Sequence, residues 1–166
     1  SLSPGLITVP QDGRFHFNEQ SHLLEAIKES INGRALDVET TLGRLKEAVF
    51  SAGNRIVPLS FTYELPTYSA NVTATELGIT ELVAESTTFY TGSTQSRVKN
   101  IIEAIERMNG LIIAPGEEFS FNHYLGDISP EEGFVQGKII FGGRTIEGVG
   151  GGVCQVSTTM FRAALK

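Results

Sequence analysis

The amino-acid sequence predicts an α+β fold in two modules, a small α/β module over residues 1–80 and a glycine-rich α+β domain over residues 81–166. Apolar residues recur at helical spacing in both modules, and alternating runs bounded by turn residues indicate short strands between the helices. Glycine marks the change in composition, since six of the 18 glycines lie in residues 1–83 and twelve in residues 84–166.

Charge and composition exclude several classes of function. The 13 Lys and Arg against 19 Asp and Glu give a net charge of −6, which opposes binding to nucleic acid and to anionic lipid or other polyanions. Local basic patches remain possible, but the sequence has no run of basic residues. No apolar stretch approaches the roughly 20 residues that cross a bilayer, and the first ten residues lack the features of a signal peptide. We therefore expect any leader or membrane anchor to lie outside this chain.

Cys154 is the single cysteine, so no disulfide can form within the chain. His16, His22 and His123 are scattered without the spacing of metal ligands, and one thiolate cannot complete a zinc site. The sequence therefore predicts no bound metal and no cofactor.

Helices in the first module are predicted from apolar spacing and caps. The first helix is expected to end at Gly33 and is predicted from the helical spacing of four apolar residues: Leu23, Leu24, Ile27 and Ile31. The second ends at Gly53 and repeats the pattern: Val38, Leu42, Leu45, Val49 and Ala52. Thr73 and Glu76 have the spacing of a capping box, which predicts a short helix ending near Gly78.

Strands in the first module are shorter. Residues 55–63 indicate a half-buried strand, and Pro58 within it favours an edge position. The apolar side chains expected on its buried face are Val57, Leu59, Phe61 and Tyr63. Residues 7–9 and 15–17 indicate two further strands, separated by a turn at residues 11–13.

The second module begins with a predicted strand over residues 81–90, which are rich in β-branched and aromatic residues. Ser96 is expected to cap a helix that ends before Gly110 and carries one apolar stripe: Val98, Ile101, Ile102, Ile105 and Met108. Pro115-Gly116 predicts a turn between residues 111–113 and 119–121.

A hairpin and a helix complete the second module. Gly142-Gly143 predicts a tight turn between strands at residues 138–141 and 144–147. After the glycine run 148–152, helical spacing resumes: Val156, Met160, Ala163 and Ala164. This pattern continues to Lys166 without a cap, so we expect the chain to be a fragment whose second domain is truncated at its C-terminus.

Cys154 is the residue with the clearest chemical potential. The glycine run before it permits positive φ angles and close backbone approach. Cys154 then opens a helix, where unsatisfied N–H groups and the helix dipole favour the reactive thiolate. We predict Cys154 as a nucleophile and the backbone of residues 150–155 as an oxyanion site. The other candidate site residues are Gln155 for catalysis, and Gly150, Gly151, Gly152, Ser157 and Asn122 for binding.

The same residues allow alternatives to this site. Cys154 also fits a small buried core residue, with the glycines required only for packing. A phosphate-binding loop needs a Lys that is absent, the dinucleotide fingerprint needs Gly at Val153, and a cysteine phosphatase needs Arg at Met160. His123 is the candidate base in the second module, although a lone loop histidine is also typical of an exposed surface.

Several motifs follow one another in the second module: Thr87-Thr-Phe-Tyr90, Arg97-Val-Lys-Asn-Ile101, Met108-Asn-Gly110, Ala114-Pro-Gly-Glu-Glu-Phe-Ser-Phe-Asn122, Gly150-Gly-Gly-Val-Cys-Gln-Val-Ser-Thr-Thr-Met160 and Ala163-Ala164. Through them, residues 85–165 resemble the VanW-like family, named for a protein encoded in some vancomycin-resistance clusters. Residues 1–80 are similar to the peptidoglycan-binding module that often precedes it, through Gly33-Arg-Ala-Leu-Asp37 and residues 57–66.

The resemblance implies an extracellular or cell-surface protein of the Gram-positive envelope, exported or membrane-anchored. Its implied partners are peptidoglycan or peptidoglycan precursors, and its implied context is glycopeptide (vancomycin) resistance. Family members continue past the position of Lys166 with segments that contain a His and an Asp. The order Cys, His, Asp is that of a transglutaminase-like triad, so the alternative function is a cysteine-dependent transferase or hydrolase acting on cell-wall peptides.

Overall fold

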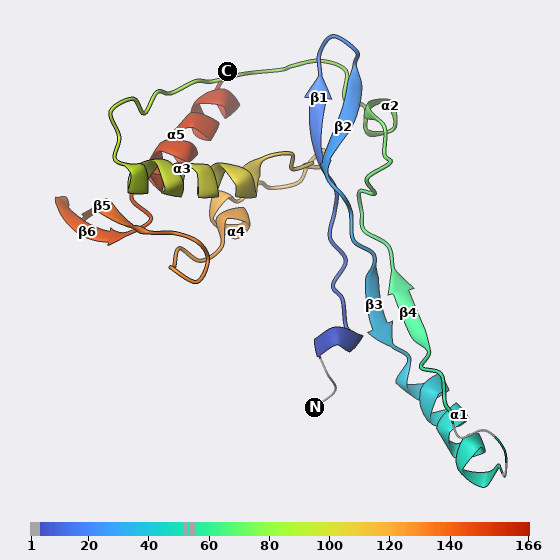
Figure 1. The fold of residues 1–166 in the computed structure, drawn as a ribbon. Helices are drawn as coiled ribbons and strands as arrows, with labels where there is room; N and C mark the ends of the chain where they lie inside the picture. Colours follow the sequence, from blue (N-terminus) through green and yellow to red (C-terminus); the bar gives the residue numbers. More distant parts are fainter. Residues whose placement is uncertain (1–3, 52, 54–55) are drawn as a thin grey trace. The chain divides into compact units, whose positions relative to one another are not determined.

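A computed structural model of the protein describes residues 4–51, 53 and 56–166. Internal contacts divide the chain into two units, Ser1–Ile79 and Thr80–Lys166 (Figure 1). Helices and small antiparallel sheets occur together in the structure, which confirms the predicted α+β class. Among the residues that the structure describes, no helix has the length and apolar character needed to cross a membrane.

The first unit is built from antiparallel strand pairs and short helices. Its elements are, in chain order, η1 (Pro4–Leu6), β1 (Arg14–Asn18), β2 (Leu23–Lys28), β3 (Gly33–Leu36), α1 (Val38–Phe50), β4 (Phe61–Glu64) and α2 (Ala74–Leu77). β1 pairs with β2. β3 pairs with β4, which follows α1 in the sequence.

Asp37 defines the start of α1 as its N-cap. Its carboxylate accepts hydrogen bonds from the Thr40 N–H at 3.0 Å and from the Thr40 hydroxyl at 2.6 Å. These bonds, the one from the hydroxyl first, hold the pKa of the Asp37 carboxyl below its ordinary value. The predicted helix from Val38 is confirmed and ends at Phe50, and Ala52 lies outside the described residues.

The predicted capping box is confirmed at α2. The Thr73 hydroxyl accepts from the Glu76 N–H at 3.3 Å, and the Glu76 carboxylate accepts from the Thr73 N–H at 2.8 Å. Gly78 ends the helix with a φ of 71°, a left-handed conformation that glycine adopts without strain.

The predicted helix from Leu23 to Ile31 is wrong, because residues 23–28 form β2. The Asn18 side chain accepts hydrogen bonds from the next turn's backbone N–H groups at 3.0 and 3.1 Å and so reverses the chain after β1. β2 then returns along β1 and pairs with it through the backbone. The apolar spacing of residues 23, 24, 27 and 31 fits a helix, whereas adjacent leucines of a strand point to opposite faces. Pairing with β1 therefore overrode the local pattern.

The predicted strand over residues 55–63 is confirmed only at its end, because β4 begins at Phe61. Pro58 lacks the N–H that a strand ladder requires, and Arg55 lies outside the described residues. Two side chains expected on the buried face are exposed: Leu59 and Tyr63. The strand predicted at residues 15–17 lies within β1, whereas residues 7–9 contribute only an isolated bridge.

The second unit packs helices around a small core and carries one hairpin. Its elements are α3 (Gln95–Met108), α4 (Phe121–Leu125), β5 (Gln136–Phe141), β6 (Arg144–Val149) and α5 (Val153–Ala164). The core cluster of buried side chains comes from α3, α4, α5 and the segment before β5: Ile101, Ala104, Met108, Leu125, Phe134, Val153 and Val156. The hairpin β5–β6 confirms the prediction, with φ of 57° and 75° at Gly142 and Gly143.

Two predictions for the second unit need correction. Thr94 caps α3 in place of Ser96, since its hydroxyl accepts from the Arg97 N–H at 3.3 Å. Residues 81–90, all of them described, are not part of a strand. Their β-branched composition favours an extended chain, but a strand also needs a backbone partner. The turn at Pro115-Gly116 is confirmed by a φ of 83° at Gly116.

Acidification is expected to weaken the start of α1. Because hydrogen bonds lower the folded pKa of Asp37, its stabilisation is complete above the ordinary value of 3.8 and is lost as the pH falls through the lower folded value. NMR titration of the carboxyl should therefore give a midpoint below 3.8. Asp37→Asn keeps a capping side chain and should remove the pH dependence. A midpoint at or above the ordinary value would contradict the cap.

Candidate functional site

The glycine run before α5 forms a turn packed against α3 and β5. Gly150 and Gly152 have φ angles of 87° and 114°, which favour glycine. A Cβ added to Gly151 would lie 2.6 Å from the carbonyl oxygen of Lys138, so a side chain cannot fit there. These glycines, predicted as binding residues, therefore have a packing role that lets the turn approach its neighbours closely.

Asn100 on α3 holds this turn in place. Its side chain is fully buried, with an exposure of 0%. Nδ2 donates to the carbonyl oxygens of Val135 at 3.0 Å and Gly151 at 3.1 Å, and Oδ1 accepts from the Val135 N–H at 2.8 Å. A buried amide with its donors and its oxygen engaged fixes the surrounding backbone in one arrangement. The bridge formed by Asn100 thus joins α3, the segment before β5 and the turn before α5.

The role of Asn100 was missed in the sequence, although a signal for it exists there. Asn100 precedes Ala104 by four residues and Met108 by eight, so it lies on a buried stripe of α3. A polar side chain on a buried stripe requires hydrogen-bond partners. What the sequence cannot supply is the identity of those partners, which lie 35 and 51 residues further along the chain.

Cys154 is the second residue of α5, and its side chain is exposed. The alternative of a buried core cysteine therefore does not hold. The side chains from the start of α5 that enter the core are those of Val153 and Val156. The structure places the thiol at the solvent-facing side of a helix N-terminus, directly after the glycine turn. Its role as a nucleophile stays a prediction.

The backbone predicted as an oxyanion site is partly occupied by internal hydrogen bonds. The Gly150 N–H donates to the Val135 carbonyl at 3.2 Å, the Val153 N–H to the Gly150 carbonyl at 3.2 Å, and the Gln155 N–H to the Gly152 carbonyl at 3.0 Å. A developing oxyanion needs donors that are not already engaged. The prediction consequently depends on the other N–H groups of the segment 150–155.

The Gln155 side chain joins α5 to the segment before α3. Its Nε2 donates to the Thr88 hydroxyl at 3.0 Å and to the Phe89 carbonyl at 3.1 Å. Its Oε1 accepts from Arg97 Nη2 at 2.5 Å, and Arg97 also donates to the Ser93 hydroxyl at 2.6 Å. The contacts of Gln155 are therefore those of a bracing side chain, and its predicted catalytic part stays untested.

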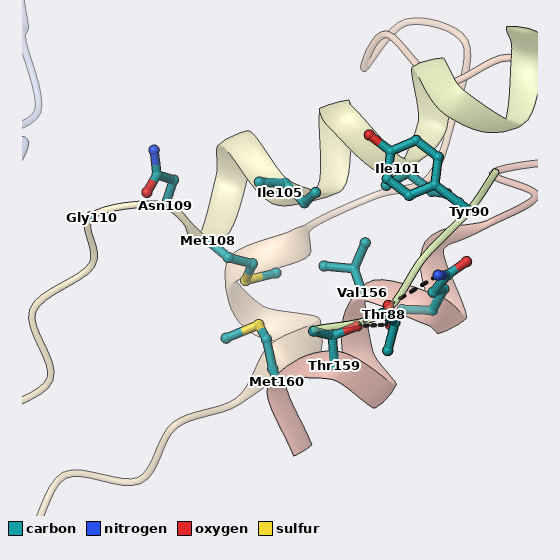
Figure 2. Close-up of a pocket in the computed structure, with 11 residues that line it drawn as sticks. Thr88, Tyr90, Ile101, Ile105, Met108, Asn109, Gly110, Val156, Thr159 and Met160 are labelled. Atoms are coloured by element: carbon teal, nitrogen blue, oxygen red, sulfur yellow. Dashed lines mark hydrogen bonds between the residues drawn. The ribbon is translucent and has the colours of Figure 1, made fainter. Parts of the chain in front are cut away.

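A pocket of about 340 Å³ lies between α3 and α5, next to residues 88–90 (Figure 2). Apolar side chains from the two helices form most of its wall: Ile101, Ile105, Met108, Val156 and Met160. Thr88 and Thr159 contribute hydroxyl oxygens 2.7 Å apart, joined by a hydrogen bond that Figure 2 marks. Among the described residues that line this pocket, none is charged and none is Cys154.

Ser157 lines a second, apolar groove of about 740 Å³ together with Phe119, Phe121 and Phe161. Cys154, Ser157 and Phe161 are spaced by three and four residues on α5, so they share one face of the helix. The groove therefore begins about one helical turn from the thiol. Of the predicted site residues, the structure brings Cys154 and Ser157 together in this way.

Asn122 and His123 lie on α4, and both are exposed. The Asn122 carbonyl accepts a hydrogen bond from the Gly126 N–H at 3.1 Å. The His123 and Tyr124 rings contact each other edge-to-face, with 5.2 Å between the ring centroids. These contacts belong to α4 and its end, so the structure offers no support for grouping either residue with the thiol. Within the described part of the chain, no group of three or more His, Cys, Asp or Glu residues is arranged to hold a metal ion.

Comparison with known proteins finds similarity within the second unit. Residues 96–166 match the family described as "VanW like protein". The chain is 37% identical over 84 residues to "Uncharacterized protein YoaR" of Bacillus subtilis (strain 168), a match that covers 51% of this chain and 28% of that protein. It is 33% identical over 67 residues to "Vancomycin B-type resistance protein VanW" of Enterococcus faecalis (strain ATCC 700802 / V583), covering 40% of this chain and 24% of that protein.

The matched regions thus span about a quarter of the length of these relatives. No solved structure matches the chain.

Removing the Asn100 bridge is expected to destabilise the second unit. Asn100→Ala removes the side-chain partner of the Val135 N–H and of the Gly151 carbonyl, while the Val135 carbonyl keeps its bond from the Gly150 N–H. This loss should lower the free energy of unfolding by about 2–4 kcal/mol. Urea denaturation measures this loss, and hydrogen exchange at the Val135 amide should accelerate. The control is Asn122→Ala on the exposed face of α4, which should change stability by no more than about 0.5 kcal/mol. Equal effects of the two substitutions would contradict the bridge.

Proposed function

Residues 96–166 belong to the VanW-like family, and from this premise we propose that the chain is part of a cell-envelope protein that associates with peptidoglycan or its precursors. The observation that carries the proposal is the match of the whole segment from α3 to α5 to this family. The relative named a vancomycin B-type resistance protein supports a role in glycopeptide resistance. Export to the cell surface, with an anchor outside this chain, belongs to the same proposal.

The first unit is the proposed attachment element. Its support is the similarity of residues 1–80 to a peptidoglycan-binding module, and the structure explains what the motif Gly33–Asp37 does for the fold. Arg34 donates to the Gly5 carbonyl at 3.0 Å, and its guanidinium lies over the Phe61 ring at 4.8 Å. Arg34 thus joins β3 to η1 and to β4, and Asp37 at the end of the motif caps α1. The surface that contacts the wall would then lie on other, exposed residues of the unit.

Retention on purified cell-wall sacculi tests the attachment. The full chain is expected to co-sediment with sacculi, and soluble muropeptides should compete for it. An unrelated globular protein of the same net charge of −6 controls for electrostatic adsorption. Retention no greater than that of the control, or retention that muropeptides leave unchanged, would contradict the proposal.

A second candidate function is a cysteine-dependent transferase or hydrolase acting on wall peptides. The observation in its favour is the exposed Cys154 at the start of α5, one turn from the groove that Ser157 lines. In such an enzyme the thiolate attacks an amide carbonyl, a thioester forms, and the amine leaves with a proton from a general acid. In family members a segment that contains a His follows this region, and we propose that His as the general acid.

Alkylation of the thiol tests this second function. Cys154 is expected to react readily with iodoacetamide, because its side chain is exposed and lies in the first turn of α5, where backbone N–H groups and the helix dipole stabilise negative charge that develops during the reaction. The matched control moves the thiol one turn along the same exposed side of α5, as Cys154→Ser combined with Thr158→Cys, and should react more slowly. Equal rates in the two proteins would remove the support for a nucleophile. Cys154→Ser alone should leave retention on sacculi unchanged.

A further inference from the structure

The turn end of the β5–β6 hairpin exposes two large apolar side chains. Ile140 is 83% exposed and Phe141 is 72% exposed, immediately before the turn glycines. A Cβ added at Gly142 or Gly143 would meet nothing within 4 Å, so the turn has open space around it. We define these four residues, 140–143, as the hairpin tip.

The base of the same hairpin is firmly held. Gly137 on β5 is buried beside the glycine turn, and a Cβ on Gly148 would lie 2.3 Å from the Ile139 side chain. Six residue pairs connect β5 and β6 without a break in register. The tip is therefore presented by an ordered ladder anchored at the other end, as the ribbon in Figure 1 shows for the two strands.

Basic side chains flank the tip. Arg144 lies opposite Phe141 across the turn, and Lys138 lies opposite Glu147 three positions back along the ladder. All three charged side chains are exposed. The Glu147 carboxylate offsets the charge of Lys138, so Arg144 provides the net positive charge of the hairpin.

The net charge of −6 does not override this local balance. At physiological ionic strength, charges further than roughly 8 Å apart are largely screened in water. Only the charges close to the tip therefore decide how the tip interacts with a charged surface. Long basic side chains can also extend toward phosphate groups while their stems lie against apolar material.

We propose that the hairpin tip docks reversibly on an anionic lipid bilayer. Ile140 and Phe141 enter the boundary between headgroups and acyl chains, and Arg144 contacts the lipid phosphates. The tip is convex and consists of four residues, whereas a specific protein interface buries about 800 Å² on each partner. A soft interface that admits two side chains fits this shape better than a protein surface does. The proposal does not depend on wall attachment or on Cys154.

Vesicle co-sedimentation with the full chain tests the proposal. The chain is expected to bind vesicles of phosphatidylcholine with phosphatidylglycerol more tightly than vesicles of phosphatidylcholine alone, and added salt should reduce the difference. Phe141→Ser should weaken binding by about tenfold or more, since it removes the larger apolar side chain. Glu147→Gln should strengthen binding to the anionic vesicles by about fivefold, because it removes the charge that offsets Lys138.

The matched control compares two identical charge reversals. Arg144→Glu at the tip should abolish the preference for anionic vesicles, whereas Arg162→Glu on the exposed surface of α5 should leave it unchanged. Circular dichroism confirms that each variant is folded. Equal effects of the two reversals, or wild-type binding by Phe141→Ser, would overturn the proposal. Self-association that depends on Phe141 and occurs without vesicle binding would overturn it as well and identify the tip as a contact between copies.

Discussion

The buried amide of Asn100 is the interaction on which the rest of the second unit depends. It is sealed from water, yet it engages backbone groups on two segments that follow it by 35 and 51 residues. Leaving any of these groups unpaired in the core would cost free energy, so the three segments are held in one arrangement. The glycine turn therefore packs closely against α3 and β5, and α5 begins where that turn ends.

The position of Cys154 follows from this constraint. With Gly151 pressed against β5, the next residues enter α5 with Val153 and Val156 directed into the core. Residue 154 is then turned to the solvent by the helical period of 100° per residue. A cysteine at a core position would be an inert apolar side chain, whereas an exposed one at a helix start can react. The packing of the turn thus decides which chemistry is open to the thiol.

Residues near the thiol contribute to two different surfaces, the pocket between α3 and α5 and the apolar groove that Ser157 lines. Gln155 and Arg97 brace the segment of residues 88–93 against the two helices through side-chain hydrogen bonds. These contacts form one side of the pocket between α3 and α5 (Figure 2). Ser157, by contrast, faces the apolar groove on the same side of α5 as the thiol. Two neighbouring surfaces of one helix therefore serve different parts of the unit.

Local features whose signals lie within a few residues of one another could be predicted from the sequence. The cap at Thr73 and Glu76, the turn at Gly142-Gly143, and helices α1, α3 and α5 all follow from contacts between near neighbours in the chain. Tertiary structure alone decided the features that depend on distant partners. Leu23–Lys28 forms a strand because it pairs with β1. Residues 81–90 form no strand, since none of the strands that the structure describes pairs with them. The Asn100 side chain binds backbone groups of Val135 and Gly151, which lie far along the chain. The physical reason is that a hydrogen bond between remote segments forms only where the folded chain brings the two segments together. The residue types of the two segments do not specify which segments become neighbours.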